Sequence, residues 1–360
     1  MSQIYLKYGA IVSSLGVGKE EHVDAFITNR SGIHKYAHSG FNGEDWFLGK
    51  IKTLINNRYN HLLTIACNEL LNNTKRELLH SERTLLIVSS TKGNINDLPN
   101  DPFDSTREIL LSYLGIVHRP VILSNACVSG VMAINLAADY IQSGHYDHVI
   151  VLGIDCISDF VVFGFQSLYA LSNTPCLPFD AERNGISIGE ACGIVILSNQ
   201  QGDGFSVQYC GGASSNDANH ISGPSRTGEG LVRAVSKAMK RTGIAAGEIE
   251  FISAHGTGTS YNDEMESIAF DRLGLHKIPL NSLKAYVGHT LGAAGVIEVI
   301  ISLFSMEKNI LFKSIGFSNN GTSKKINVIR ENENKNINIV LKTASGFGGT
   351  NAALLLKKIA

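Results

Sequence analysis

Three apolar segments of the first half of the chain recur, in the same order, in the second half. The pairs are 84–94 with 249–260, 121–141 with 278–304, and 149–160 with 339–351. Their strand portions are continuously apolar rather than alternating, which is typical of sheets covered on both faces. Because these strands alternate with helical segments, the pattern predicts an α/β fold. A chance likeness between generic strand–helix units is the alternative, but an order kept three times favours an internal duplication.

The helices that this pattern predicts over 128–141 and after Gly292 have no continuous polar face. Such helices are buried rather than amphipathic. We therefore expect two similar α/β halves packed around a shared layer of buried helices. The polar, glycine-containing turn at 199–204 separates them, which gives an N-terminal half over 1–200 and a C-terminal half over 201–360.

Composition narrows the class of partner. The chain has 360 residues, of which 44% are hydrophobic and 18% charged, as in well-packed globular proteins. A net charge of −1 gives no long-range field that would attract nucleic acid or an anionic membrane. The lysine-rich stretch 324–342 is interrupted by Glu331 and Glu333, and its pattern predicts a solvated surface.

The sequence contains no clear targeting signal or metal motif. The first residues, MSQIYLKYGAIVSSLG, lack the basic stretch, apolar core and cleavage site of a secretory signal. No apolar run reaches the ~18 to 20 residues of a membrane span. The six cysteines are widely spaced and form no C-x-x-C pair, so neither a zinc site nor a redox motif is indicated. A reducing, cytoplasmic compartment is therefore expected.

The first candidate for chemistry is Cys127, in the segment SNACVSG between a strand and a helix. At such a turn, free backbone N–H groups and the positive end of the helix dipole favour a thiolate over a thiol. The thiolate is the nucleophile in covalent catalysis. For a single cysteine the alternative is a small buried hydrophobe.

Two histidines are further candidates. His255 directly follows a buried strand and precedes GTGTS, which puts an imidazole at the carboxyl end of a strand, where α/β sheets gather ligands. His289 follows Lys284 by five residues and precedes a helix start made of small residues. Lys284 lies in an otherwise apolar segment and needs a carboxylate partner if it is buried; Glu298 is the best local candidate. The alternative is a pair of core histidines and a lysine that reaches the surface.

The segment SGFGGTN (345–351) is the last candidate. Glycines on both sides of Phe347 permit unusual backbone angles and a movable aromatic ring. A backbone N–H here could serve as an oxyanion donor. A plain glycine-rich turn is the alternative, and a phosphate-binding loop is disfavoured because no helix-opening GK[ST] follows.

Taken together, these segments resemble the β-ketoacyl synthases of fatty-acid and polyketide biosynthesis, which are members of the thiolase superfamily. The resemblance runs almost from end to end of the chain. It rests on YGAIVSSLG, NRSGI, NACVSG, CLPFDAERNGISIGEACGIVILS, AHGTGTSYNDEMES, NSLKAYVGHTLGAAG and GFGGTN, in the family's order. It implies a duplicated thiolase-like fold, in which two similar α/β halves form a five-layered α-β-α-β-α core.

The resemblance assigns catalytic roles residue by residue. Cys127 matches the acylated nucleophile. His255 and His289 match the pair that holds the malonyl thioester and assists its decarboxylation. Phe347 matches the gating phenylalanine, whose backbone N–H joins that of Cys127 in the oxyanion hole.

Other positions match supporting residues of the family. Lys284 matches a lysine that orders the site, with Glu298 at the position of its carboxylate partner. Thr257 and Thr259 match threonines that contact the phosphopantetheine arm. Acidic residues of the same segment match positions that we interpret as structural: Asp263 and Glu266.

The implied activity is that of an acyltransferase. It is the decarboxylative Claisen condensation of an acyl thioester, held on Cys127, with malonyl-[acyl-carrier-protein], in fatty-acid or polyketide/polyene-type biosynthesis. The implied partners are acyl carrier protein and a second ketosynthase-like subunit, in a homodimer or in a heterodimer with a paralogue such as a chain-length factor. No metal and no organic cofactor is expected, because the carrier protein bears the phosphopantetheine.

Other functions compete with this one. A non-catalytic subunit resembling a chain-length factor usually lacks the nucleophile, which this chain keeps. A degradative thiolase needs a second cysteine near the C-terminus, and here no cysteine follows Cys210. Synthases that start chains from acyl-CoA usually carry Asn in place of the second histidine.

The chain also departs from the family's pattern. It is short between Ser90 and Pro120, a region that helps to shape the acyl pocket and the dimer interface in the family. Val128 stands where a small polar residue is common, and Ser345 where another phenylalanine is usual. A shorter wall and a smaller side chain predict a more open tunnel, suited to a long or rigid unsaturated acyl chain in a specialised pathway.

Overall fold

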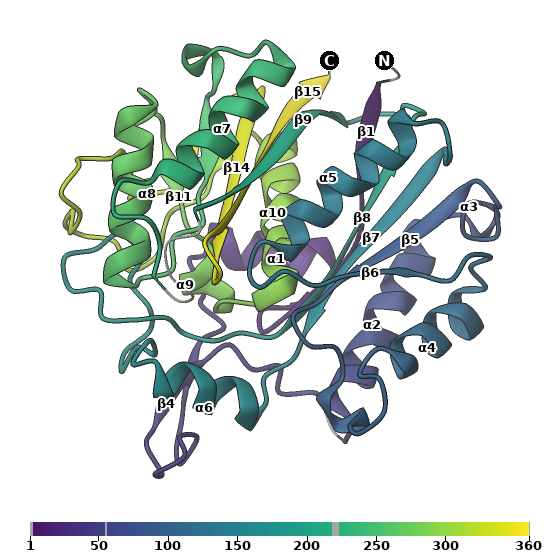
Figure 1. Cartoon of the computed structure of the whole chain (residues 1–360), viewed down its shortest axis with the longest axis horizontal. Coiled ribbons are helices and arrows are strands. Elements are labelled where there is room, and N and C mark those ends of the chain that lie inside the picture. The colour runs from purple at the N-terminus through teal and green to yellow at the C-terminus, as the bar shows by residue number, and fades with distance from the viewer. Residues whose placement is uncertain (1–2, 55, 218–222, 360) are drawn as a thin grey trace.

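The computed structural model describes residues 3–54, 56–217 and 223–359. Strands and helices alternate over most of the chain (Figure 1). The strands are β1 (Ile4–Ser13), β2 (Gly16–Val17), β3 (His34–Tyr36), β4 (Trp46–Leu48), β5 (Thr84–Ser89), β6 (Val121–Leu123), β7 (His148–Asp155), β8 (Ala191–Ser198), β9 (Ser206–Asn216), β10 (Phe251–Ser253), β11 (Leu280–Asn281), β12 (Ile310–Leu311), β13 (Glu333–Asn334), β14 (Ile339–Gly346) and β15 (Thr350–Ile359). The α-helices are α1 (Gly18–Ile27), α2 (Arg58–Asn73), α3 (Arg76–Leu79), α4 (Asp104–Leu114), α5 (Ser129–Gln142), α6 (Asp159–Ser167), α7 (Glu229–Thr242), α8 (Ser260–Arg272), α9 (Lys284–Val287) and α10 (Ala294–Lys308). Short 3-10 helices cover Ile95–Asp97, Ala246–Glu248 and Leu291–Ala293.

Most strands belong to one hydrogen-bonded path, in the order β6-β5-β7-β8-β1-β9-β15-β14-β10-β11. The path has the same plan from either end. β5 is parallel to β6 and β7, as β10 is to β11 and β14. The strands nearer the middle are antiparallel in both halves. The segment pairs predicted to be duplicated occupy equivalent places, namely β5 and β10, β6 and β11, and β7 and β14, so the α/β duplication is confirmed.

The two halves also share a strand edge, which the sequence pattern did not predict. β1 pairs with β9 in an antiparallel register, from Ile4 opposite Tyr209 to Leu6 opposite Val207. The boundary that we place at 200/201 falls in the connection between β8 and β9. A division into two domains at that point stays a prediction.

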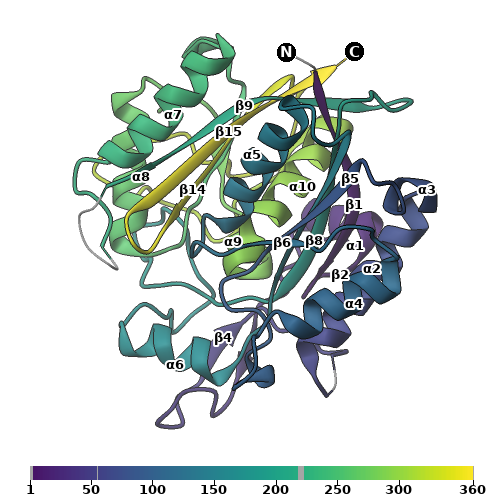
Figure 2. The same cartoon turned by 45° about the vertical axis from the view of Figure 1, so that its right-hand side comes forward.

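Helices α5 and α10 form the middle layer between the strands of the two halves (Figures 1 and 2). Both are buried, as their lack of a polar face predicted. Helices α2 and α4 cover the outer face of the N-terminal strands, and α7 and α8 cover that of the C-terminal strands. The order of layers is therefore α-β-α-β-α, the thiolase-like arrangement that the resemblance implied.

Two glycines let the buried helices cross at backbone contact. A Cβ atom at Gly130 would lie 2.7 Å from the backbone nitrogen of Val296, and one at Gly295 would lie 2.6 Å from that of Val131. Only glycine fits at such distances. The crossing lies at the N-terminal ends of α5 and α10, so it brings the turn before α5, with Cys127, close to the turn before α10, with His289.

Over the described parts of the chain, no α-helix combines the length and the apolar character that crossing a membrane requires.

Candidate active site

Cys127 sits in a strained turn between β6 and α5. The preceding residue, Ala126, has a φ of +44°, a left-handed conformation that is unfavourable for a residue with a side chain. The hydroxyl of Ser129 accepts a hydrogen bond from the Asn125 N–H (2.7 Å) and donates one to the Ala126 carbonyl (2.6 Å). These bonds hold the turn and fix where the Cys127 sulfur points.

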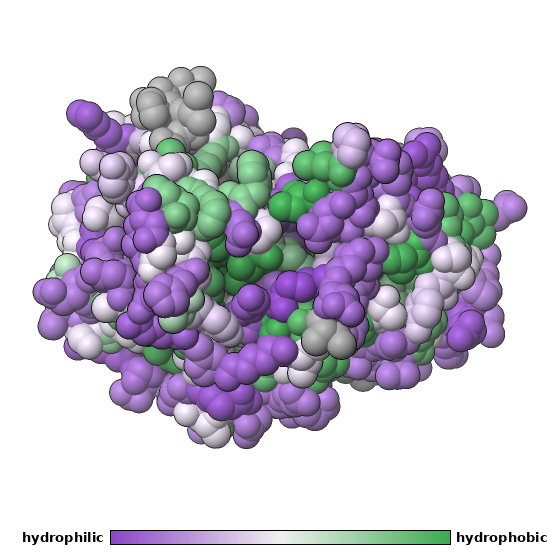
Figure 3. Space-filling model, turned by 90° about the horizontal axis from the view of Figure 1, so that it is seen from below, coloured by the Kyte–Doolittle hydropathy of each residue, from purple (hydrophilic) through white to green (hydrophobic). Residues whose placement is uncertain are grey.

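The sulfur faces a cavity of about 400 Å³. The size is that of a site for a small molecule or for part of a larger substrate. Residues from α6 and α8 line it together with Cys127, His255 and His289. The face of the molecule that carries α6 and β4 is hollowed near its centre, where apolar and polar side chains meet (Figure 3).

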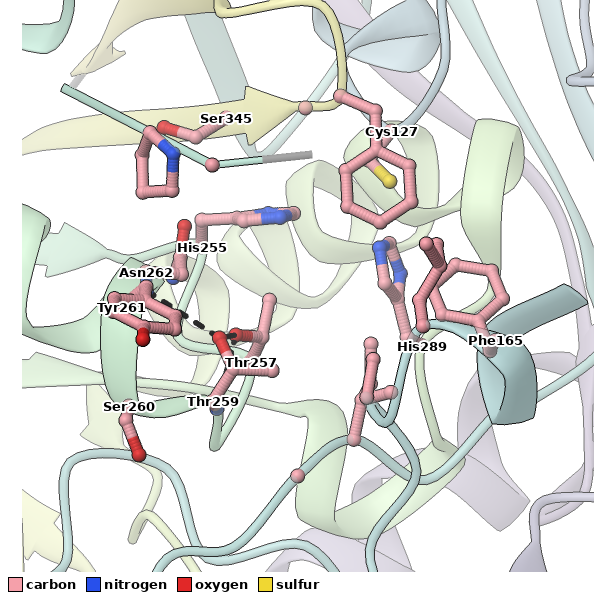
Figure 4. A pocket seen from close by; sticks show the side chains of 18 of the residues that line it. Cys127, Phe165, His255, Thr257, Thr259, Ser260, Tyr261, Asn262, His289 and Ser345 are labelled. Atoms are coloured by element: carbon pink, nitrogen blue, oxygen red, sulfur yellow. Dashed lines mark hydrogen bonds between the residues drawn. The ribbon is translucent and has the colours of Figure 1, made fainter. Parts of the chain in front are cut away.

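Cys127, His255 and His289 converge inside this cavity (Figure 4). The sulfur and one ring nitrogen of each histidine all lie within 4.8 Å of one another. The two imidazole rings are 5.3 Å apart between centroids and nearly perpendicular, at 82°. The three residues come from the start of α5, the end of β10 and the turn after α9. The structure thus assembles the three residues that the sequence singled out.

Both histidines are held in the tautomer with a proton on Nε2. Nδ1 of His289 accepts the backbone N–H of Leu291 at 3.2 Å. Nδ1 of His255 lies 3.3 Å from Nζ of Lys284, an ammonium that can only donate. Burial lowers the pKa of each imidazole well below its usual value, and the charge of Lys284 lowers it further. Each ring is therefore neutral near pH 7 and presents an N–H donor rather than a lone pair.

This tautomer decides what the cluster can bind. A cysteine and two histidines at this spacing are a possible ligand set for zinc or copper. A metal would need the Nε2 lone pairs, which requires a proton on Nδ1, where each ring faces a donor. His289 Nε2 is buried and has no hydrogen-bond partner within the part of the chain that the structure describes. The arrangement suits an incoming oxyanion better than a cation.

Lys284 connects His255 to a buried carboxylate, as the sequence predicted. Its Nζ donates to the backbone carbonyl of His255 and lies 2.7 Å from Oε1 of Glu298. Both side chains are buried. The ion pair therefore holds the His255 ring in place on its Nδ1 side.

Glu298 has a second cationic partner that sequence reasoning missed. Nζ of Lys342 lies 2.7 Å from Oε2 of Glu298, which makes a second ion pair on the same carboxylate. Lys342 is fully buried, and the stretch also contains buried apolar residues such as Ile337 and Leu341, so the prediction of a solvated surface over 324–342 is wrong at these positions. The position of Lys342 inside the apolar run NIVLKTASG is the signal that could have identified it.

Because Glu298 forms ion pairs with two lysines, neutralising it should lower the free energy of unfolding more than neutralising one lysine does. Glu298→Gln leaves Lys284 and Lys342 buried without a countercharge and is expected to lower the free energy of unfolding by about 3–5 kcal/mol. Lys284→Met leaves Glu298 paired with Lys342 and should cost less. Denaturant unfolding measures both. Equal losses in the two variants would show that Lys342 does not share the carboxylate.

The loop after His255 is organised by two buried acids. Asp263 accepts the backbone N–H of Thr257 and that of Gly258, and Glu266 accepts the N–H of His255. Burial raises the pKa of Glu266 to about 7. Both acids act on the backbone, in line with the structural part that we gave them.

The threonines of this loop lie at one end of the cavity. Thr257 and Thr259 both line it, and their hydroxyl oxygens are 2.8 Å apart. In Figure 4 they lie with Ser260 and Tyr261 on the side away from Phe165.

The glycine-rich segment after β14 closes the other side. The Phe347 ring stacks on the Phe165 ring, with centroids 5.6 Å apart and planes at 26°. A Cβ atom at Gly346 would lie 3.2 Å from the backbone nitrogen of Cys127, so the two peptides run side by side. Ser345 donates to Oδ1 of Asn351 at 2.7 Å. Phe165 was not predicted, because its stacking depends on where α6 packs.

Burial dominates the acidity of Cys127. It raises the pKa of the thiol to about 12, although Lys284 lowers it. The backbone N–H of the turn also lowers the pKa, as expected, but burial outweighs it. Below its pKa, the thiolate fraction rises about tenfold for each pH unit. Iodoacetamide alkylation of Cys127, followed by peptide mass spectrometry, should accelerate about tenfold per pH unit, and so about a hundredfold from about pH 7 to about pH 9. A rate that levels off in this range would contradict the high pKa.

Comparisons with known proteins agree with this site. The family model "Beta-ketoacyl synthase, N-terminal domain" matches residues 112–202, and "Beta-ketoacyl synthase, C-terminal domain" matches residues 208–318. Together they cover more than half of the chain.

Curated relatives match over part of their length. The 3-oxoacyl-[acyl-carrier-protein] synthase 2 of Rhizobium meliloti (strain 1021) is 35% identical over 250 residues, which are 65% of this chain and 59% of that protein. The enzyme of the same name from Staphylococcus aureus (strain COL) is 31% identical over 249 residues, 65% of this chain and 60% of that protein. The matched part is thus less than two thirds of these relatives.

Solved structures match almost the whole chain. A chain from the complex of a ketosynthase with its chain length factor from Xenorhabdus doucetiae has a TM-score of 0.90 at 26% identity, covering 99% of this chain and 98% of that one. A β-ketoacyl synthase from Burkholderia phymatum STM815 has a TM-score of 0.86 at 22% identity over the full length of both, which shows the fold. With both family models matched in order, and with Cys127, His255 and His289 assembled in one cavity, the chain belongs to the β-ketoacyl synthase family.

Proposed function

We propose that this chain is a β-ketoacyl-[acyl-carrier-protein] synthase that condenses an acyl thioester, held on Cys127, with malonyl-[acyl-carrier-protein]. The observation that carries the proposal is the convergence of one thiol and two neutral imidazoles in a single cavity. Each imidazole presents an Nε2–H donor to the space beside the sulfur. Such a site can hold an acyl group and stabilise an enolate next to it.

The first half-reaction transfers the acyl group. The Cys127 sulfur attacks the carbonyl carbon of the acyl thioester, and the backbone N–H groups of Cys127 and Phe347 stabilise the oxyanion. Collapse of this intermediate breaks the bond to the pantetheine sulfur. The acyl group stays on Cys127, and the thiol proton ends on the departing pantetheine.

The second half-reaction makes the carbon–carbon bond. The malonyl thioester loses CO₂, and the electron pair of the broken bond becomes an enolate. The Nε2–H groups of His255 and His289 stabilise the charge where it develops, on the thioester oxygen. The enolate carbon attacks the acyl group and expels the Cys127 thiolate, which then takes up a proton. The product is a β-ketoacyl thioester two carbons longer than the acyl group.

The remaining predicted residues have supporting parts in this proposal. Lys284, paired with Glu298, holds the ring of His255. Thr257 and Thr259 contact the phosphopantetheine arm of the carrier protein, because they line the end of the cavity away from Phe165. Phe347 acts as a movable door, since its ring stacks on Phe165 beside the sulfur.

The alternative is a non-catalytic subunit resembling a chain-length factor. A subunit without chemistry needs neither a thiol in the cavity nor histidines whose tautomers are fixed. This chain has both features: the Cys127 thiol lies in the cavity, and hydrogen bonds fix the tautomers of His255 and His289. The geometry therefore favours the catalytic subunit.

Partners and location complete the proposal. Structures similar to this one include a ketosynthase with its chain length factor and a ketosynthase with its acyl carrier protein. We infer that this chain also meets an acyl carrier protein in the cytoplasm and pairs with a second copy or a paralogue. A measurement of mass in solution, with and without candidate partners, tests the pairing, and an active monomer would overturn it.

The experiment that tests the function is a direct assay. Purified protein, an acyl-carrier substrate and malonyl-carrier substrate should yield CO₂ and a β-ketoacyl carrier, detected by mass spectrometry. A series of acyl chains tests the prediction of a long or rigid unsaturated substrate, and restriction to acetyl primers would refute it. Absence of product with every chain would remove the proposed function.

A further inference from the structure

Lys342 is a buried cation for which the proposed mechanism has no use. It lies on β14 with no exposed surface. Its Nζ is 2.7 Å from Oε2 of Glu298, 3.1 Å from the carbonyl oxygen of Ser253 and 3.2 Å from that of Ala254. Burying an ammonium is costly, and a core strand position would accept an apolar side chain. The cost calls for a physical explanation.

The contacts of Lys342 lead to His255 by two routes. Ser253 and Ala254 directly precede His255, so Lys342 fastens the end of β10 that carries the imidazole. Glu298 joins Lys342 to Lys284, and Lys284 contacts Nδ1 of His255 at 3.3 Å. The lysine thus reaches the ring through the backbone on one side and through an ion-pair chain on the other.

Lys342 also changes the charge beneath the histidines. Lys284 and Glu298 alone would form a neutral pair, and Lys342 adds one positive charge to it. Burial lowers the pKa of Lys342, and the charge of Lys284 lowers it further, whereas the adjacent Glu298 carboxylate raises it. The titratable and charged groups around His255 are Cys127, Glu266, Lys284, His289, Glu298 and Lys342.

A positive charge at this place keeps the imidazole neutral. An added cation disfavours protonation of a nearby histidine. A protonated His255 would carry a proton on Nδ1, where Lys284 already donates. Protonation would therefore break the contact with Lys284 that holds the ring with its Nε2–H toward the cavity. The neutral ring is the form that the second half-reaction needs.

We propose that Lys342 is a positioning residue of the condensing site, whose charge, shared through Glu298 with Lys284, keeps His255 neutral and its Nε2–H directed at the substrate in mildly acidic solution. The role rests on the proposed function, because it concerns decarboxylation of the malonyl thioester. It is distinct from the oxyanion donors, since Lys342 itself does not touch substrate. A purely structural lysine would hold the two carbonyls without affecting how the histidine titrates.

The test separates charge from hydrogen bonding. Lys342→Met removes both, and Lys342→Gln removes the charge but keeps N–H donors for the carbonyls of β10. In both variants the acid limb of the pH profile for malonyl-carrier decarboxylation should move up by about one pH unit, the order of effect that one nearby charge has on a titrating group. Lys342→Arg keeps the charge and should keep the wild-type limb. Acylation of Cys127 should stay at the wild-type rate in all three.

A matched control is available on the neighbouring strand. Lys358 on β15 also donates to a backbone carbonyl, that of Met306, but lies outside the site. Lys358→Met should change neither half-reaction nor the pH profile. A wild-type acid limb in Lys342→Gln would overturn the proposal and leave Lys342 a structural residue.

The titration of His255 can also be followed by NMR, which tests the proposal without measuring enzyme activity. In protein labelled with ¹⁵N-histidine, the His255 ring should begin to protonate at higher pH in Lys342→Gln than in the wild type, with Lys358→Met unchanged. This titration needs no substrate, so it decides on Lys342 even where the wild-type chain fails to condense. Coincident titrations in the wild type and in Lys342→Gln would refute the role of the charge.

Discussion

Replacement of Cys127 by alanine is expected to abolish formation of the acyl-enzyme while the protein stays folded. The sulfur lines the cavity, where it lies within 4.8 Å of a ring nitrogen of each histidine. Alanine keeps the Cβ atom and the strained turn around Ala126, so the loss of one buried sulfur should cost little stability. Intact-protein mass spectrometry after incubation with an acyl-carrier substrate gives the readout.

The matched control is Cys67→Ala. Cys67 is fully buried against the outer face of the N-terminal strands and is not among the residues that line the cavity. Its variant should be acylated to the same extent as the wild type. Stoichiometric acylation of Cys127→Ala would show that another residue carries the acyl group.

The sequence predicted the fold because burial leaves a strong pattern. Strands covered on both faces are largely apolar, so β7 and β14 stand out, and so do the helices α5 and α10, which lack a continuous polar face. The shared edge between β1 and β9 has no such signature. It depends on a few backbone pairs between strands about 200 residues apart, and backbone pairing does not require particular side chains.

The site was predicted where its residues stand at the ends of core elements. Cys127, His255 and His289 each follow a strand or precede a buried helix, and the fold brings such ends together. Phe165 was not predicted, because no local sequence pattern links α6 to the segment with Phe347. The rings of Phe165 and Phe347 come together only in the folded structure.

Lys342 escaped for a different reason. The stretch 324–342 was interpreted from its overall content of charged and polar residues, which is typical of a solvated surface. One lysine of the stretch, Lys342, lies in the core and shares Glu298 with Lys284. From the sequence, only Lys284 could be suggested as a partner of Glu298. No local sequence pattern shows that β14, with Lys342, packs next to α10, with Glu298.

Replacing a histidine of the pair should impair one half-reaction and spare the other, since both histidines act on the enolate and not on the acyl transfer. Nε2 of His289 is buried and without a hydrogen-bond partner among the described residues, which leaves it free for the malonyl thioester oxygen. Its Nδ1 is occupied by the Leu291 N–H, so the ring cannot turn its proton elsewhere without losing that bond. An alanine in its place removes one of the two donors to the developing charge.

His289→Ala should therefore slow malonyl decarboxylation by about a hundredfold or more, the scale of losing one oxyanion donor, while Cys127 is still acylated. Release of CO₂ from malonyl-carrier substrate and the mass of the acyl-enzyme report the two steps separately. His148→Ala is the control, because His148 is a partly buried histidine on β7 that hydrogen-bonds to Ser198 outside the cavity. That variant should retain both activities. A His289→Ala enzyme that decarboxylates at the wild-type rate would exclude His289 as an enolate donor and leave His255 alone in that role.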